Sequence, residues 1–237
     1  MVTRNRGPFV KRAVRAFQNQ THERRELIVM DDGADDTGAF ISGLDDPRIR
    51  YVRPEGDTLA LGELRNQAIR HAEGELIMQW DDDDWCRPDR IRIQLAAMLY
   101  TDSQFCFLSR WTLFWPKRNL FVYSKELCWE GSILALRAVI PTYPPLRCGE
   151  DSALVQQVLN SSARVCFVDD PDLYVYIVHG GNTYGEEHFS NNIFAGHTGK
   201  LEEEKVAGII RELESATVSE AQPVRKWSEG CEIVTRY

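Results

Sequence analysis

The chain has 237 residues, of which 43% are hydrophobic, and its formal net charge is −8. This length fits one large domain, and this hydrophobic content can fill a core of ordinary size. An acidic chain without a long basic run attracts nucleic-acid backbones and anionic lipids poorly, so a nucleic-acid polymer is not an expected partner. The composition excludes neither docking at a membrane surface nor formation of a homo-oligomer.

Six cysteines are scattered along the chain without a CxxC pair. Disulfide scaffolds and zinc sites space their cysteines more closely, so we expect free or buried thiols in a reducing compartment. No apolar stretch reaches the roughly 18 residues that cross a membrane, and no signal-peptide core follows Met1. These features predict a cytoplasmic protein without a transmembrane segment.

The N-terminal part alternates between helical and strand-like patterns. Apolar spacing predicts helices around residues 10–17, 61–72 and 91–99, and solid apolar runs predict strands at 27–30, 49–52 and 76–80. We expect Thr58 to cap the second helix and Pro88 to lie in the first turn of the third. This alternation is typical of right-handed βαβ units, and it predicts an α/β fold.

The C-terminal part has a different pattern. Residues 105–127 resemble aromatic-rich strands paired antiparallel, followed by expected helices at 151–159 and 201–213 and strands at 165–168 and 173–178. Residues 215–237 have no clear period. We find no internal repeat and no linker, so we expect one domain over residues 1–214 and a C-terminal tail at 215–237.

Acidic residues follow two of the expected strands: Asp31 and Asp32 follow one, and the run from Asp81 to Asp84 follows another. In open α/β sheets, ligands bind outside the carboxyl ends of the strands. Adjacent carboxylates repel one another unless a cation offsets them, and Mg²⁺ or Mn²⁺ prefers carboxylate and phosphate oxygens. The pattern favours a metal-bridged phosphate ligand, while a solvated loop of turn-forming aspartates stays open as the alternative.

Two further features allow both a structural and a functional interpretation. Glu150 and Asp151 begin an expected helix, where acidic residues favour the helix dipole and where a carboxylate could also act as a general base. The tryptophans could fill the core or stack on sugar rings. Trp129, Glu130 and Gly131 are our candidates for acceptor contact.

Four segments resemble successive motifs of glycosyltransferase family 2. They are TRNRGPFVKRAVRAFQNQT (3–21), RELIVMDDGADDT (25–37), LRNQAIRHAEGELIMQWDDDDW (64–85) and GEDSAL (149–154). The resemblance covers residues 2–180, and four motifs in the right order are more specific than any one of them. It implies the GT-A fold, with a mostly parallel central sheet, flanking helices and a small antiparallel element. Residues 1–100 would form the nucleotide-binding half and residues 101–214 the acceptor half.

The resemblance also implies a reaction: an inverting transfer of a sugar from a nucleotide-diphosphate donor, commonly a UDP-sugar, to a hydroxyl of a glycan, lipid-linked or protein acceptor. The implied cofactor is a divalent metal, Mn²⁺ or Mg²⁺. The residues placed at the nucleotide sugar are Thr3, Arg4, Asn5, Asp31, Asp32, Arg65, Asp81 and Asp82. Those placed at the metal are Asp83, with Asp81 and with His179 from YIVHGGNTY (176–184), and the catalytic base is Asp151 with Glu150 beside it. With four aspartates in a row, the register of the DxD motif is ambiguous by one position.

One departure and two rival functions remain. Only Met1 and Val2 precede Thr3, so we expect a first strand shorter than the family's. A nucleotidyltransferase would also need carboxylates near a phosphate, although no Gly-rich or strongly basic phosphate loop stands out here. A non-catalytic nucleotide-sugar-binding module is the second rival.

Overall fold

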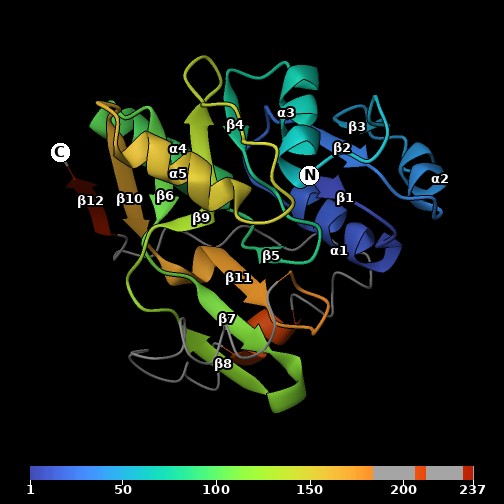
Figure 1. Ribbon diagram of the computed structural model, residues 1–237. Coiled ribbons are helices and arrows are strands. Elements are labelled where there is room, and N and C mark those ends of the chain that lie inside the picture. Colours follow the sequence, from blue (N-terminus) through green and yellow to red (C-terminus); the bar gives the residue numbers. More distant parts are fainter. Residues whose placement is uncertain (184–205, 212–231, 237) are drawn as a thin grey trace.

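The computed structural model describes residues 1–183, 206–211 and 232–236, and in this part the strands form three sheets (Figure 1). The first sheet is fully parallel, in the order β1 (Val2–Thr3), β2 (Leu27–Asp31) and β3 (Ile49–Val52). The second has the order β12 (Glu232–Arg236), β10 (Val165–Asp169), β6 (Phe105–Leu108), β9 (Trp129–Leu136) and β4 (Leu76–Met78). The third has the order β5 (Trp85–Cys86), β11 (Tyr174–Ile177), β7 (Thr112–Trp115) and β8 (Leu120–Tyr123).

Helices cover the sheets. The α-helices are α1 (Gly7–Gln18), α2 (Thr37–Ser42), α3 (Leu61–His71), α4 (Arg90–Thr101) and α5 (Glu150–Leu159), and residues 206–211 are also helical. Two 3₁₀ turns, Pro116–Arg118 and Pro171–Leu173, precede β8 and β11. Among the described residues, no helix is both long and apolar enough to span a membrane.

The central strands of the second sheet are buried on both faces because helices pack on each. Successive side chains of a strand point to opposite faces. Phe105 and Phe107 of β6 join a core cluster with Leu154 of α5, whereas Cys106 belongs to the main core together with Met98 of α4. Helices α4 and α5 therefore sandwich this sheet, as the solid apolar runs of its strands predict.

The first sheet brings the ends of its strands to one edge. All five residues of β2 are buried, and α3 packs against β1 and β2. The parallel register pairs Thr3 with Asp31, so two of the residues expected at the nucleotide are neighbours. Strand β1 has two residues, as expected from the short segment before Thr3.

Most of the expected elements are present, and an α/β architecture is confirmed. The third sheet contains the expected antiparallel aromatic hairpin, β7 with β8. Residues 206–211 of the helix expected at 201–213 are helical, and residues 201–205 and 212–213 lie outside the described part. The boundary at residue 214 and the division into two halves stay predictions.

Several details of the sequence interpretation are wrong. The N-cap of α3 is Ala60, whose backbone N–H donates to the Glu63 carboxylate at 2.8 Å, and Thr58 lies earlier with a left-handed φ of 58°. Helix α4 begins at Arg90, so Pro88 precedes its first turn. Strand β4 ends at Met78, and Leu173 belongs to a 3₁₀ turn.

Several elements were missed, among them the two-residue strand β5. Residues 129–136 form β9, the longest strand described, and residues 37–42 form α2. Within the tail, where the sequence has no clear period, Glu232–Arg236 pair antiparallel with β10. In short segments, or segments interrupted by glycine, the alternation of apolar and polar residues is too weak to predict a strand or helix. Such a strand is stabilised instead by pairing with its neighbour.

Gly62 allows α3 to approach the loop before α5. A Cβ at this position would lie 1.9 Å from the Pro144 carbonyl oxygen, which is backbone and cannot swing aside. We expect Gly62→Ala to lower the free energy of unfolding by about 1–3 kcal/mol through overpacking, although alanine is the better helix former. Urea unfolding followed by circular dichroism measures the change.

Gly208 is the matched control because it is also helical and has no described atom within 4 Å of a built Cβ. Gly208→Ala should leave stability unchanged or raise it. If both variants behaved alike, close packing at Gly62 would be contradicted.

Candidate active site

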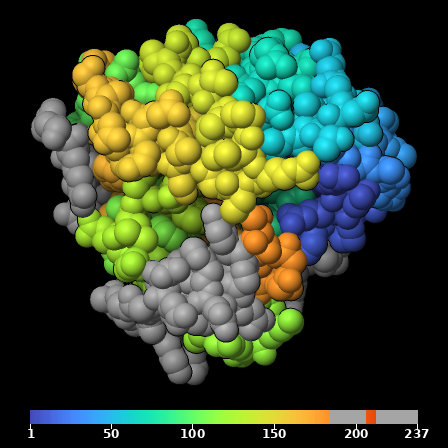
Figure 2. All heavy atoms as spheres, viewed as in Figure 1, coloured from blue at the N-terminus to red at the C-terminus, as the bar shows by residue number. Residues whose placement is uncertain are grey.

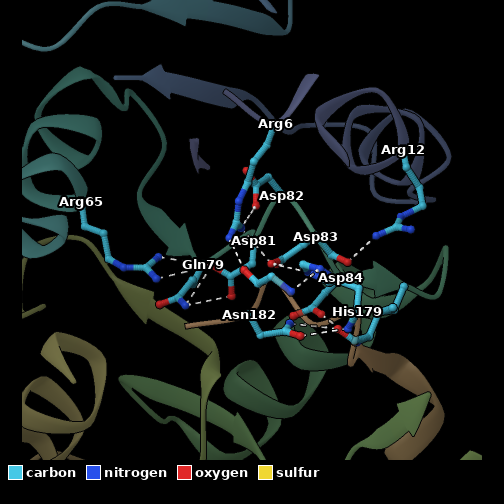
Figure 3. Close-up of polar contacts among 12 residues, drawn as sticks. Arg6, Arg12, Arg65, Gln79, Asp81, Asp82, Asp83, Asp84, His179 and Asn182 are labelled. Atoms are coloured by element: carbon cyan, nitrogen blue, oxygen red, sulfur yellow. Dashed lines mark hydrogen bonds and ion pairs between the residues drawn. The ribbon is translucent and has the colours of Figure 1, made fainter. Parts of the chain in front are cut away.

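Loops from all three sheets meet where the aspartate run follows β4 (Figure 3). The antiparallel register of β5 with β11 pairs Tyr174 with Cys86 and so brings the chain after β11 alongside the aspartates. In Figure 2, the blue N-terminal segment, the yellow segment around α5 and the orange segment around β11 adjoin one another on one face of the molecule. Segments distant in sequence thus build one site.

Each aspartate has its own partners. Asp81 faces α3 and β4: its carboxylate accepts from Gln79 Nε2 at 3.0 Å and lies 3.4 Å from Arg65 Nη1. Asp81 Oδ2 also lies 3.3 Å from the Tyr174 hydroxyl oxygen. Asp81 is therefore held by the neutral Gln79 amide and by the Arg65 guanidinium. The same guanidinium also contacts Glu150 of α5.

Asp82 and Asp83 share one cation. Arg6 Nη1 donates to Asp82 Oδ1 at 3.1 Å and to Asp83 Oδ2 at 2.9 Å (Figure 3). Burial, and secondly repulsion by Asp83, raise the pKa of Asp82 to about 6. Burial acts in the same direction on Asp83, but His179 and Arg6 outweigh it and hold the pKa of Asp83 below its usual value. Arg12 also donates to the Asp83 carbonyl oxygen.

His179 faces Asp83 with its Nε2 atom, 3.1 Å from Oδ2. The Gly181 N–H donates to His179 Nδ1 at 3.2 Å, so in this arrangement the proton sits on Nε2 and is donated to the carboxylate. Phe9 lies against the imidazole, with ring centroids 4.6 Å apart. His179 thus acts here as a donor to Asp83, and metal ligation through Nε2 would require the other tautomer.

Asp84 has a structural role. Its side chain is 4% exposed; Oδ2 accepts from the Tyr174 hydroxyl at 2.5 Å and Oδ1 from the Ile177 N–H at 3.0 Å. Burial, and then the charges of Asp83 and Asp81, raise its pKa well above the usual value. Asp84 therefore ties the aspartate run to β11 and does not face outward.

The expected nucleotide side contains one buried and one accessible carboxylate. Asp31 is fully buried and accepts from the Gly33 N–H at 2.7 Å and the Tyr51 hydroxyl at 2.9 Å. Asp32 is partly exposed and lies 3.5 Å from Arg4. Asn5, at a left-handed φ of 55°, accepts from the Ala34 N–H at 2.8 Å, which joins this loop to the end of β1.

The start of α5 is joined to the aspartate run by Arg65. Arg65 Nε donates to Glu150 Oε1 at 2.9 Å, while its Nη1 approaches Asp81. Burial opposes the charged form, but Asp81 and Glu150 together raise the pKa of Arg65. Asp151 follows directly and is partly exposed, and its Oδ1 accepts from the Ser152 N–H at 2.8 Å. Asp81 and Glu150 therefore share one guanidinium, and Asp151 is the residue that follows Glu150 in the chain.

The expected acceptor segment lies on β9. A Cβ on Gly131 would stand 3.3 Å from Asp81 Oδ2, and Glu130 Oε1 accepts from the Ser152 hydroxyl at 3.2 Å. Trp129 is partly buried and stacks on Trp111 with centroids 4.3 Å apart. The other tryptophans considered for sugar stacking are core residues: Trp80, Trp85, Trp111 and Trp115 are each at most 5% exposed.

A cavity of about 110 Å³ lies between α3 and strands β2 and β4, with Arg65, Gln79 and Tyr143 in its wall. Sites for drug-sized ligands occupy roughly 300–1,000 Å³, so this cavity is too small for a nucleotide sugar. It belongs to the packing behind Asp81.

Sequence reasoning missed several members of the site. Arg6 stands two residues beyond Arg4 in the same TRNR segment, and Arg12 follows on the next turn of α1, so both were within a recognised motif. No sequence pattern indicated Tyr174 or Gln79, because their contacts depend on the pairing of β5 with β11 and on the packing around Asp81.

A divalent cation fits this site through oxygens. Asp82 Oδ2 is buried without a hydrogen-bond partner, and Asp83 presents a carboxylate beside it. Within the described ranges, no three His, Cys, Asp or Glu side chains gather closely enough to hold a metal by themselves. Mg²⁺ is commonly held by one or two carboxylates together with substrate phosphates, which is the kind of site that these two aspartates offer.

Comparisons with known proteins agree with the motifs. Residues 1–146 match the model of glycosyl transferase family 2. The succinoglycan biosynthesis protein ExoO of Rhizobium meliloti (strain 1021) is 35% identical over 208 residues, covering 75% of this chain and 59% of that protein. The GalNAc(5)-diNAcBac-PP-undecaprenol beta-1,3-glucosyltransferase of Campylobacter jejuni is 34% identical over 85 residues, covering 35% of this chain and 28% of that protein. The chain thus spans less than two thirds of the length of these curated relatives.

Among solved structures, S. aureus TarS 1–349 in complex with UDP-GlcNAc matches with a TM-score of 0.63 and 15% identity, covering 94% of this chain and 66% of that one. The architecture is that of the GT-A glycosyltransferases. The chain belongs to glycosyl transferase family 2.

The pKa of Asp82 generates a prediction about stability. Because the pKa rises from 3.8 to about 6 on folding, the native state binds the extra proton between these values, and the free energy of unfolding falls as pH rises through this window. We expect Asp82→Asn to become increasingly more stable than the wild type from pH 4 to pH 7. Urea unfolding at several pH values measures the difference.

The asparagine oxygen can still accept from Arg6, so the variant removes mainly the buried charge. Asp57→Asn, at an exposed position, is the control and should give a pH-independent difference. An equally flat difference for Asp82→Asn would contradict the raised pKa.

Proposed function

We propose that this chain transfers a sugar from a nucleotide-diphosphate sugar to an acceptor hydroxyl, with inversion at the anomeric carbon. The observation that carries this proposal is the network from Asp81 through Arg65 to Glu150, which joins the aspartate run to the segment holding Asp151. A donor held at the aspartates would thereby have its anomeric carbon within the same site as a carboxylate base. UDP is the expected carrier, in keeping with the UDP-sugar in the structurally similar TarS complex.

Asp151 is the proposed general base. In the described residues only its Oδ1 has a hydrogen bond, to Ser152 N, which leaves Oδ2 to accept a proton. The acceptor oxygen forms its bond to the anomeric carbon as its proton passes to Asp151, and the bond to the diphosphate oxygen breaks on the opposite face. Nucleoside diphosphate leaves with the electron pair of that bond. Holding both substrates in one site supplies the alignment.

Glu150 supports this arrangement. Burial raises its pKa, against the opposing effect of Arg65, which keeps it ion-paired. Glu150 therefore positions the first turn of α5, and the partly exposed Asp151 next to it does the chemistry. On β9, Glu130 and Gly131 stand between Ser152 and Asp81, where an acceptor would have to approach.

Asp83 is the proposed principal metal ligand, with Asp82 beside it and Mn²⁺ or Mg²⁺ as the cofactor. Such a cation supplies electrostatic stabilisation to the negative charge that builds on a departing diphosphate. Asp81 is engaged by Arg65 and Gln79, so its proposed role is toward the sugar. His179 would join the ligand set only after exchanging its tautomer.

The two rivals make different products. A nucleotidyltransferase would release pyrophosphate, and a binding module would release neither product. The described loops contain no Gly-rich phosphate cradle, which favours sugar transfer over nucleotidyl transfer. The connected Asp81–Arg65–Glu150 network favours an enzyme over a module, because donor binding alone requires no link to a base.

We expect Asp151→Asn to retain donor binding and to lose at least about a hundredfold in turnover, since a general base contributes about 10²–10⁴. The assay measures nucleoside diphosphate released from nucleotide sugars, with water and with a panel of hydroxyl acceptors. Glu23→Gln, at an exposed position remote from the site, is the charge-matched control. Normal turnover by Asp151→Asn would remove this residue as the base.

A thermal-shift screen tests donor and metal together. A ligand that binds the native state raises its apparent stability by mass action. We expect one nucleotide sugar to raise the melting temperature with Mn²⁺ present and to do so far less without it. Shifts that are the same with and without Mn²⁺ would contradict the metal dependence.

A further inference from the structure

We propose that Arg6 occupies the place of the divalent cation on Asp82 and Asp83, and that it moves to the donor's diphosphate when metal and nucleotide arrive together. Arg6 would thus make the two ligands bind cooperatively. This inference rests on the proposed function, because it assumes a metal and a nucleotide diphosphate at this site.

The contacts of Arg6 carry the argument. One nitrogen, Nη1, bridges the two carboxylates at 3.1 and 2.9 Å, while Nη2 donates to the Gly181 carbonyl oxygen at 2.9 Å. The guanidinium thus offers one positive charge to two carboxylates. Figure 3 shows it lying between the α1 side of the site and the aspartates.

A cation and Arg6 compete for the same two carboxylates, and at Asp83 for the same oxygen. Asp83 Oδ2 already accepts from Arg6 Nη1 at 2.9 Å and from His179 Nε2 at 3.1 Å, so its lone pairs are occupied. A divalent ion on this oxygen must displace a donor, and it would also repel the positive guanidinium. Metal alone therefore has to break the Arg6 contacts without compensation.

A diphosphate supplies that compensation. The Arg6 side chain is 32% exposed, so it can leave the carboxylates without being pulled from a closed core. A guanidinium binds phosphate oxygens through paired, charge-assisted hydrogen bonds, for which its planar fork is suited. Arg6 also stands at the N-cap of α1, where the helix dipole favours an anion. A diphosphate bound by Arg6 would therefore lie close to the N-terminus of α1.

Cooperativity follows from these two exchanges. Without nucleotide, Arg6 weakens the binding of metal; with nucleotide, the same residue strengthens the complex by binding phosphate. Thermodynamic linkage requires the coupling to be reciprocal, so metal must tighten nucleotide by the factor by which nucleotide tightens metal. Couplings of this kind are typically about 5–150-fold.

The test measures free Mn²⁺ by electron paramagnetic resonance in titrations of the full chain, with and without UDP, and with a correction for the Mn²⁺–UDP complex in protein-free solution. For the wild type we expect UDP to tighten Mn²⁺ binding about tenfold or more. For Arg6→Gln we expect Mn²⁺ alone to bind about tenfold more tightly and the effect of UDP to shrink to about twofold. Arg6→Lys keeps the charge but loses the planar fork proposed to bind the diphosphate, and it should fall between the two.

Arg15→Gln is the matched control, because Arg15 is exposed on the same helix. It should reproduce the wild type, and circular dichroism verifies that all variants fold. If Arg6→Gln bound Mn²⁺ alone no more tightly than the wild type and kept the full UDP effect, the role of Arg6 would be overturned. A wild type that takes up no Mn²⁺ with UDP, GDP or dTDP would instead overturn the metal dependence in the proposed function.

Discussion

The structure depends on how four consecutive carboxylates are accommodated in a mostly buried place. Like charges this close are tolerated only when each has hydrogen-bond donors or a cation of its own. Here the donors come from four separate parts of the chain: Arg6 before α1, Arg65 on α3, Tyr174 on β11 and His179 after it. The hydrogen bonds and ion pairs of the aspartate run therefore hold α1, α3 and the third sheet close to the end of β4. The fold and the site share one set of interactions.

Within that set the aspartates divide the work. Asp84 is buried and anchors β11, and Asp81 faces α3 and α5, which leaves Asp82 and Asp83 as the pair bridged by Arg6. This division has a cost in stability, because burial of Asp82 raises its pKa to about 6 while the carboxylate is ionised at neutral pH. Functional sites commonly carry such a cost.

Arg65 gives the site its second organising contact. Its side chain is 13% exposed, and it contacts both Asp81 and Glu150, the latter 85 residues further along the chain, so the segment after β4 and the start of α5 are held together. Gly62 contributes on the same helix by letting the Pro144 backbone approach it. Donor-side and base-side groups are thereby positioned by α3, a rigid element, and not by loops alone.

The sequence by itself determined the family, the α/β class, most helices and the placement of acidic residues after β2 and β4, because apolar period and motif order are local properties. It also brought attention to the TRNR segment, although to Arg4 and not to Arg6. The partners of each aspartate, the buried state of Asp31 and the strand β9 were decided only by the tertiary structure. They depend on the register of β5 with β11 and on packing between elements far apart in the chain, and no local pattern encodes which distant donor reaches which carboxylate.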